Sequence, residues 1–140
     1  MLKDFFKKKE NKNEDNNILV AALLVHAARI DENYTESEKK IIIKAIMDLN
    51  KLDSNKAEKI LKDAEKKESE SNQIVEFTRT IKKYPIEFRL KIIEIIWKIV
   101  YSDGKNDSYE SGLIRRICGL LYVSDKESGI IKTKIINQTK

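Results

Sequence analysis

Cysteine and histidine are nearly absent from this sequence, which contains one of each, Cys118 and His26. A disulfide within the chain needs two cysteines, and a tetrahedral zinc site of the usual kind needs four Cys or His ligands, so the composition excludes both. We expect His26 to be a partly buried, hydrogen-bonded side chain and Cys118 to be a packed thiol rather than a nucleophile. A lone thiol is typical of a reducing compartment, which favours a cytoplasmic protein.

Helix-breaking residues are also scarce, with one proline and four glycines in 140 residues. Apolar residues make up 41% of the chain, an ordinary share that can form a hydrophobic core, whereas the charged share of 36% is high. Few breakers combined with abundant Ile, Leu, Lys and Glu predict an all-α fold. The length is that of one domain.

Long hydrophobic runs and catalytic motifs are missing as well. Met1–Glu10 is too short and too charged to be a signal peptide, and the uncharged stretch Asn16–Ala28 is too short to cross a bilayer. The sequence contains no P-loop, no dinucleotide-binding fingerprint and no nucleophile elbow. We therefore expect no enzymatic activity; a hydrolase would need carboxylates paired with a nucleophile, and the sequence offers no such pair.

Positive charge is concentrated in the second half of the chain. Residues 71–140 carry 13 Lys and Arg against 8 Asp and Glu, whereas the two signs balance in residues 1–70. No dense basic cluster with interleaved aromatics occurs, so we expect a solvated basic face and no specific nucleic-acid binding. Binding of nucleic acid or of a membrane surface through this face is the weaker alternative, and the cations available for it are Arg115, Arg116, Lys132 and Lys134.

The first 17 residues are expected to lie outside the main domain. Met1–Lys9 has the spacing of a short amphipathic helix, and the polar, Asn-rich segment Glu10–Asn17 is typical of a flexible linker. We favour docking of this helix on the core. The alternative is contact of residues 1–10 with a membrane surface or a partner through Phe5, Phe6 and the lysines beside them.

Residues 18–140 are predicted to form a bundle of about seven to eight helices in two pseudo-symmetric halves. Two of the helices are apolar on nearly every side and should occupy the centre. Asn16 or Asn17 is expected to cap the first of them, and Ser124 to begin the last with a capping box. The expected helices cover Ile18–Arg29, Glu36–Asn50, Ser54–Glu68, Ile74–Ile81, Ile86–Tyr101, Ser108–Tyr122 and Ser124–Asn137.

An internal repeat in the sequence supports the prediction of two pseudo-symmetric halves. When Asp31 is placed over Asp103, a shift of about 72 residues, the apolar positions of the flanking helices coincide. Each half then reads as a buried helix, an acidic turn, an amphipathic helix, a short turn and another helix. The two repeats are about 18–68 and 86–138, and such similarity indicates duplication.

The acidic turns are the most informative feature of the sequence. Each contains an Asp, a capping residue four positions later and a Glu three positions after that. The simplest interpretation is a helix-capping box, with Thr35 and Asp107 as N-caps and Glu38 and Glu110 as their partners.

The more specific interpretation of the two acidic turns is a cation site. If a pseudo-twofold axis brings the turns together, their carboxylates would repel, and a divalent cation such as calcium would relieve the repulsion. An EF-hand is excluded, because the position that needs a bidentate Glu is Ile42 or Ile114. The candidate metal ligands are Asp31, Glu38, Asp103 and Glu110.

The segment AARIDENYTESEKKII, echoed by IVYSDGKNDSYESGLIRRI, resembles the TerB-like domain of tellurite-resistance proteins, which also resembles the N-terminal region of the DjlA co-chaperone. The resemblance covers roughly Ile18 to Ile136. It implies a compact helical fold and a bacterial, cytoplasmic stress-response protein with a metal-sensing or scaffolding role. It also assigns the family's acidic positions to the same four residues. The chain departs from the family pattern at Glu32, where Gly is usual, and at Ser102, where Ala is usual.

These observations lead to two functional hypotheses. The first is a non-catalytic module that binds another protein, with a divalent cation modulating the interaction. The second is a dedicated module for binding or sensing a metal ion. No other cofactor is expected.

Overall fold

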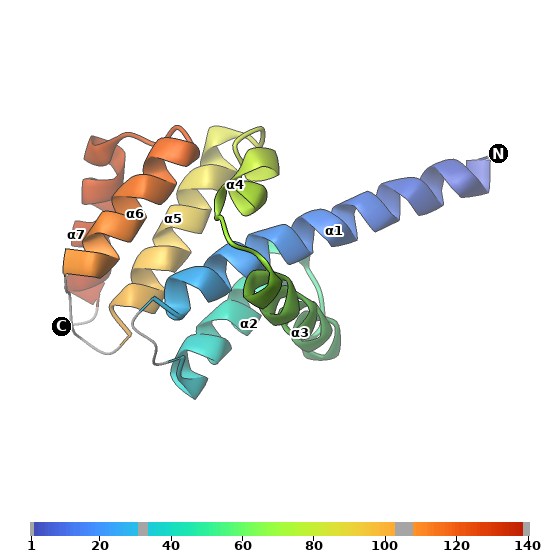
Figure 1. Cartoon of the computed structure of the whole chain (residues 1–140), viewed down its shortest axis with the longest axis horizontal. Coiled ribbons are helices and arrows are strands. Elements are labelled where there is room, and N and C mark those ends of the chain that lie inside the picture. The colour runs from blue at the N-terminus through green and yellow to red at the C-terminus, as the bar shows by residue number, and fades with distance from the viewer. Residues whose placement is uncertain (1, 31–33, 103–107, 139–140) are drawn as a thin grey trace.

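The computed structural model describes residues 2–30, 34–102 and 108–138, with side chains described for 15–30, 34–102 and 112–138. The described residues form helices joined by turns, without a strand, which confirms the all-α prediction. No helix in this part of the chain is both long and apolar enough to span a membrane. The helices, shown in Figure 1, are α1 (Leu2–Ala28), α2 (Glu36–Asn50), α3 (Ser54–Glu70), α4 (Val75–Ile81), α5 (Ile86–Val100), α6 (Ser108–Leu120) and α7 (Asp125–Gln138).

The second half of α1 and the whole of α5 form the centre of the bundle. α1 packs against α2, α3, α4 and α5, while α5 packs against α2, α6 and α7. Leu23 and Leu24 of α1 and Ile96 of α5 are completely buried. The two helices predicted to be central are therefore central, because neither has a polar face wide enough to lie against water.

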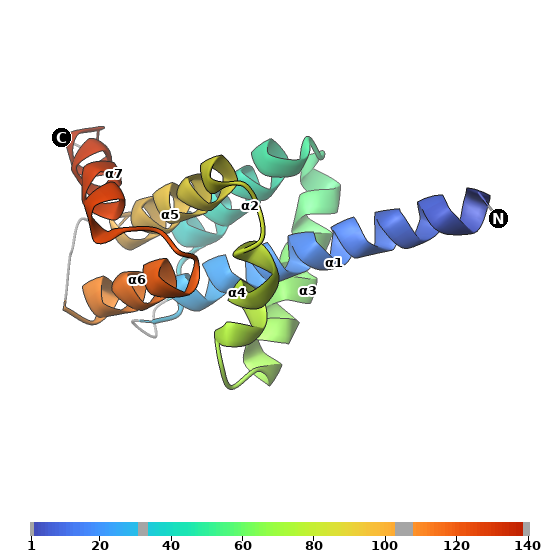
Figure 2. The same cartoon turned by 90° about the horizontal axis from the view of Figure 1, so that it is seen from above.

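The N-terminal half of α1 differs from the prediction. A linker was expected at residues 10–17 and a new helix from Asn16 or Asn17, but α1 continues without a break from Leu2 to Ala28. Its first half projects away from the other helices (Figures 1 and 2). No Gly or Pro interrupts this stretch, and a helix anchored at its buried end extends at little cost through Lys, Glu and Asn. The separation of residues 1–17 from a domain at 18–140 remains a prediction.

Both halves end their second helix with the same backbone conformation. Lys51 after α2 and Tyr122 after α6 have positive φ angles of 53° and 56°. In each case the next residue donates a backbone hydrogen bond five residues back, over 3.1 Å from Leu52 and 2.9 Å from Val123. This is the Schellman ending of a helix. Lys51 and Tyr122 align in the repeat when its shift is shortened by one residue, so the matched geometry supports duplication.

The residues that begin α3 and α7 also correspond. Asp53 accepts a hydrogen bond from the backbone N–H of Lys56 at 2.9 Å. Ser124 accepts one from the N–H of Glu127 at 3.1 Å, and its hydroxyl donates to the Glu127 carboxylate at 3.0 Å. The N-cap predicted at Ser124 is confirmed, and Glu127 pairs with the Ser124 hydroxyl. Local sequence therefore determines where these helices start.

Candidate cation site at the first acidic turn

Of the four predicted metal ligands, only Glu38 has a described side chain. Asp31 and Asp103 lie outside the described residues, as does Glu32. Glu110 belongs to α6, but its side chain is outside the described set. The four-residue cation site therefore remains a prediction, and the structure informs it through Glu38 and its surroundings.

Glu38 closes a capping box at the start of α2. Its Oε1 accepts hydrogen bonds from the backbone N–H of Thr35 at 2.8 Å and from the Thr35 hydroxyl at 3.0 Å. The Thr35 hydroxyl in turn accepts from the N–H of Glu38 at 3.1 Å. The predicted box is confirmed, and Glu38 is only 7% exposed. Any role of Glu38 in holding a cation must coexist with this capping role.

Tyr34 lies beside Glu38 with its hydroxyl group buried. The hydroxyl oxygen has no hydrogen-bond partner of ordinary length among the described residues. Burial raises the pKa of Tyr34 above its ordinary value of 10, and the neighbouring Glu65 carboxylate raises it further. The phenol therefore remains a neutral donor that faces two carboxylates, Glu65 and Glu38.

Two cationic side chains flank the Tyr34 ring. The Arg29 guanidinium carbon lies 5.1 Å from the ring centroid, and the Lys39 ammonium nitrogen lies 5.0 Å from it. Both distances allow a cation–π attraction. The negative charge beside the first turn is thus partly balanced by protein cations, so an added metal ion would compete with them.

His26 and Arg29 connect the end of α1 to α3. The Nδ1 atom of His26 lies 3.2 Å from Oε1 of Glu68, and Arg29 forms an ion pair with the other oxygen of the same carboxylate. The Glu68 side chain is 12% exposed and that of His26 is 30% exposed. The expected partly buried, hydrogen-bonded histidine is confirmed. Its partner could not be read from the sequence, because Glu68 is 42 residues away.

The carboxyl ends of α1 and α5 lie on the same side of the molecule (Figures 1 and 2). Each of the two acidic turns follows one of these ends. The carboxyl end of a helix carries a partial negative charge, so two such ends add to the negative potential of the turns. Among the described residues, no group of three or more His, Cys, Asp or Glu side chains is arranged to hold a metal ion.

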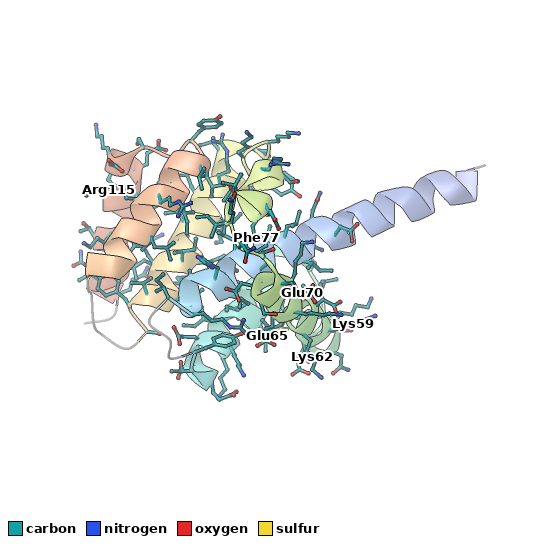
Figure 3. All side chains as sticks on the ribbon, in the orientation of Figure 1. Lys59, Lys62, Glu65, Glu70, Phe77 and Arg115 are labelled. Carbon is teal, nitrogen blue, oxygen red and sulfur yellow. The ribbon has the colours of Figure 1, made fainter. Side chains whose placement is uncertain are left out.

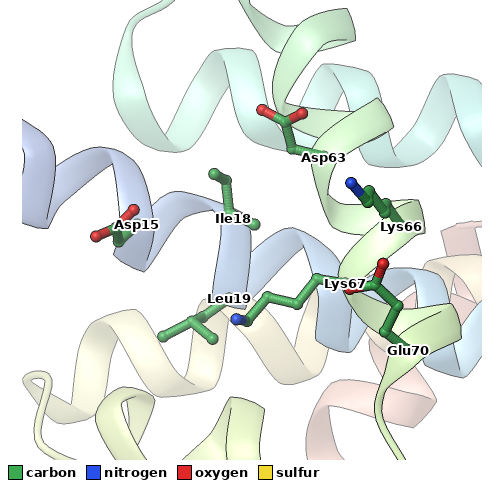
Figure 4. A pocket seen from close by; sticks show the side chains of 7 residues that line it. All are labelled: Asp15, Ile18, Leu19, Asp63, Lys66, Lys67 and Glu70. Atoms are coloured by element: carbon green, nitrogen blue, oxygen red, sulfur yellow. The ribbon is translucent and has the colours of Figure 1, made fainter.

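An open cleft of about 470 Å³ lies between α1 and α3. Figure 4 shows its apolar side chains, Ile18 and Leu19, coming from α1, while α3 supplies both acidic and basic side chains. A second cleft of about 420 Å³ is lined by Tyr84, Pro85 and Phe88 together with two asparagines and a leucine. Neither lining contains a His or Cys. The sequence analysis identified neither cleft, because each is formed by segments distant in sequence.

Cys118 and Trp97 lie in the core of the second half. Cys118 is 1% exposed, and burial raises the pKa of its thiol. A buried thiol with a raised pKa is mostly protonated at neutral pH, as expected for a packing residue. Trp97 is 5% exposed and belongs to the hydrophobic core, whereas Phe88 is only partly buried.

Comparison with known proteins gives one match. A family model described as tellurite resistance protein TerB matches residues 17–133, which is most of the chain. No curated protein and no solved structure matches.

Proposed function

The chain belongs to the TerB family of tellurite resistance proteins, and on this premise we propose that it is a non-catalytic module that binds another protein. A divalent cation held at the acidic turns would modulate that binding. The proposed ligands are Asp31, Glu38, Asp103 and Glu110. We place this activity in the cytoplasm, where the single thiol, Cys118, would stay reduced.

The observation that carries the proposal is the shared direction of α1 and α5. Their carboxyl ends lie on one side of the bundle, so the acidic turn that follows each helix begins on that side. Glu38 stands at the start of the helix after the first turn, with its carboxylate held in a buried position. Carboxylate oxygens from more than one segment are the ligands that a hard cation such as calcium requires.

A non-catalytic role is supported by the surroundings of the most reactive residues. The hydrogen bond described for the His26 ring goes to the Glu68 carboxylate and not to a serine, threonine or cysteine. Cys118 is 1% exposed. General acid–base or nucleophilic catalysis needs such groups in contact.

Thermal unfolding with and without calcium tests the cation. A ligand that binds only the folded state stabilises it by about 2.7 kcal/mol at one hundred times its Kd. We expect calcium to raise the Tm of the wild type and to leave the Asp31→Ala/Asp103→Ala variant unchanged. Glu36→Ala is the matched control, because Glu36 is an exposed carboxylate near the first turn but outside the proposed ligand set.

The outcomes separate the alternatives. An unchanged Tm of the wild type, or an equal rise in the double variant, removes the cation from the proposal. If calcium binds, affinity capture from the source cells in calcium and in chelator tests the protein partner. A partner retained only in calcium, and lost with the double variant, supports the modulated module. A cation site with no captured partner favours a dedicated ion-binding or ion-sensing module instead.

A further inference from the structure

A small cleft of about 180 Å³ lies among α5, α6 and α7 and shares no lining residue with the cleft between α1 and α3. Trp97 of α5 and Ser128 of α7 line it, together with charged side chains from α6 and α7. Figure 3 labels one of these, Arg115, on the α6 side of the molecule. The cleft belongs to neither the capping boxes nor the proposed cation site, so its lining needs a separate explanation.

A buried hydrogen bond between α5 and α7 forms part of the inner wall of the cleft. The Nε1–H of Trp97 donates a hydrogen bond to the Ser128 hydroxyl oxygen at 3.1 Å, and Ser128 is only 6% exposed. The hydroxyl accepts from the indole, and its own hydrogen is directed to the Cys118 thiol: burial raises the pKa of that thiol, and the hydrogen bond from Ser128 acts in the opposite direction. The hydrogen bonds of Ser128 therefore join α5, α6 and α7 at the wall of the cleft, and the groups left to bind a ligand are its cations.

Two cations from different helices stand at the rim. Arg115 comes from α6 and Lys132 from α7, and the Lys132 ammonium nitrogen lies 5.2 Å from the centroid of the Trp97 ring. Neither cation forms an ion pair with a carboxylate in the described part of the chain. By contrast, the nearby lysines Lys98 and Lys134 both contact Glu94, at 3.9 Å and 3.7 Å.

One carboxylate, Asp125, also lines the cleft, which leaves an excess of one positive charge. Asp125 is the first residue of α7, where the partial positive charge of the helix start stabilises a carboxylate. The second half of the chain carries the whole net charge of +5, which attracts anions toward this side. The electrostatics of the cleft therefore favour a small anion over a cation.

We propose that this cleft binds a small oxyanion of the phosphate type. Arg115 and Lys132 would supply charge-assisted hydrogen bonds. The cleft volume of about 180 Å³ lies below the range of about 300–1,000 Å³ for drug-sized ligands, which favours an ion of the size of phosphate over a whole nucleotide.

Trp97 provides a direct test, because it is the only tryptophan in the chain and it lines the cleft. Its emission is followed while sodium phosphate replaces sodium chloride at constant ionic strength. We expect a saturable change with phosphate. Arg115→Gln and Lys132→Gln should each weaken the apparent Kd by roughly 10- to 100-fold, the effect of losing one charge-assisted hydrogen bond.

Arg116→Gln is the matched control, because Arg116 is the exposed neighbour of Arg115 and does not line the cleft. It should leave the Kd within about twofold. Since Lys132→Gln also removes a cation from the indole, the NMR shift of the Trp97 Nε1–H serves as a second readout. A change that never saturates, or equal weakening by Arg116→Gln, would show a general ionic effect and would overturn the proposal.

Competing anions identify the source of the phosphate group. Tighter binding of phenyl phosphate than of inorganic phosphate supports a site for the phosphoryl end of a larger molecule, and the reverse order supports a site for the free ion. Equal binding of acetate would overturn the proposal, because the cleft would then recognise charge alone. None of these results depends on the acidic turns, so these experiments test the anion site independently of the proposed cation site.

Discussion

Tyr34 lies where the capping box of α2 meets a cluster of charged side chains. Glu38 is held by Thr35 in the capping box, while Tyr34 is enclosed between Glu38, Glu65 and the cations Arg29 and Lys39. Sequence reasoning identified the cap, which depends on residues three apart. The position of Glu65 depends on the packing of α3, so the cluster was not identified.

The buried Tyr34 hydroxyl predicts a specific loss of stability at alkaline pH. Its pKa in the folded protein is above 10, so the folded form retains the proton that the unfolded chain releases. The raised pKa of Tyr34 contributes fully to the free energy of unfolding below pH 10. Above pH 10 this contribution falls by up to about 1.4 kcal/mol per pH unit. Urea unfolding of Tyr34→Phe between pH 9 and 11 should lack this part of the decline.

Tyr122→Phe is the control for that measurement, because Tyr122 is 69% exposed. It should reproduce the alkaline decline of the wild type. At neutral pH, Tyr34→Phe should be neutral or slightly stabilising, since it removes a buried hydroxyl without a well-formed hydrogen bond. An alkaline decline unchanged in Tyr34→Phe would contradict the assigned burial.

Among the elements, the helix ends were predicted well and the continuity of α1 was not. The caps at Thr35, Asp53 and Ser124 each join residues three apart in sequence, so the types of residue at that spacing identify them. The segment at residues 10–17 is polar and suggested a linker. It is helical because α1 is anchored further along, where the burial of its second half stabilises the helix as a whole.

The Schellman ending of α2 predicts a stabilising substitution. Lys51 has a φ of 53°, a conformation that strains any residue with a Cβ atom, and its side chain is exposed. Lys51→Gly should raise the free energy of unfolding by roughly 0.5–1 kcal/mol, because the relief of strain exceeds the added entropy of the unfolded chain. Urea unfolding measures the change. Lys51→Ala retains the Cβ atom, and a similar gain in that variant would refute the explanation.

At the scale of the whole molecule, the two halves share one core. α1 of the first half packs directly against α5 of the second, and α2 contacts α5 as well. Leu23 and Ile96 are both completely buried. A core that crosses the boundary between repeats couples their unfolding, so the chain should unfold in a single transition.

Truncation of either core residue tests this coupling. Leu23→Ala and Ile96→Ala should each lower the free energy of unfolding by about 2–5 kcal/mol. Trp97 emission, which reports on the second half, and far-UV circular dichroism should give the same midpoint in both variants. Ile130→Ala is the control, because Ile130 is 63% exposed, and it should change stability by less than about 0.5 kcal/mol. Two separate midpoints in Leu23→Ala would show that the halves unfold independently.

The candidate site was predictable only in part. The turn positions and the capping role of Glu38 follow from local spacing, and the duplicated motif identified the family that the family model also matches. The participation of Asp31, Asp103 and Glu110 in a common site remains a prediction. Sequence reasoning placed Arg115 and Lys132 on a basic face together with Arg116 and Lys134, but it did not identify the cleft that brings the first two together, because that cleft depends on how α5, α6 and α7 pack.

The sequence alone determined the helical class, the capped starts of α2, α3 and α7, and the two central apolar helices, and it contains the repeat, because these depend on propensities and spacings within a few turns of chain. Tertiary structure decided which polar side chains meet. His26 contacts Glu68, and Trp97 contacts Ser128, across 42 and 31 residues. Such pairs depend on the angle and register at which helices pack, and the pattern of a single helix specifies its buried face without specifying its neighbour.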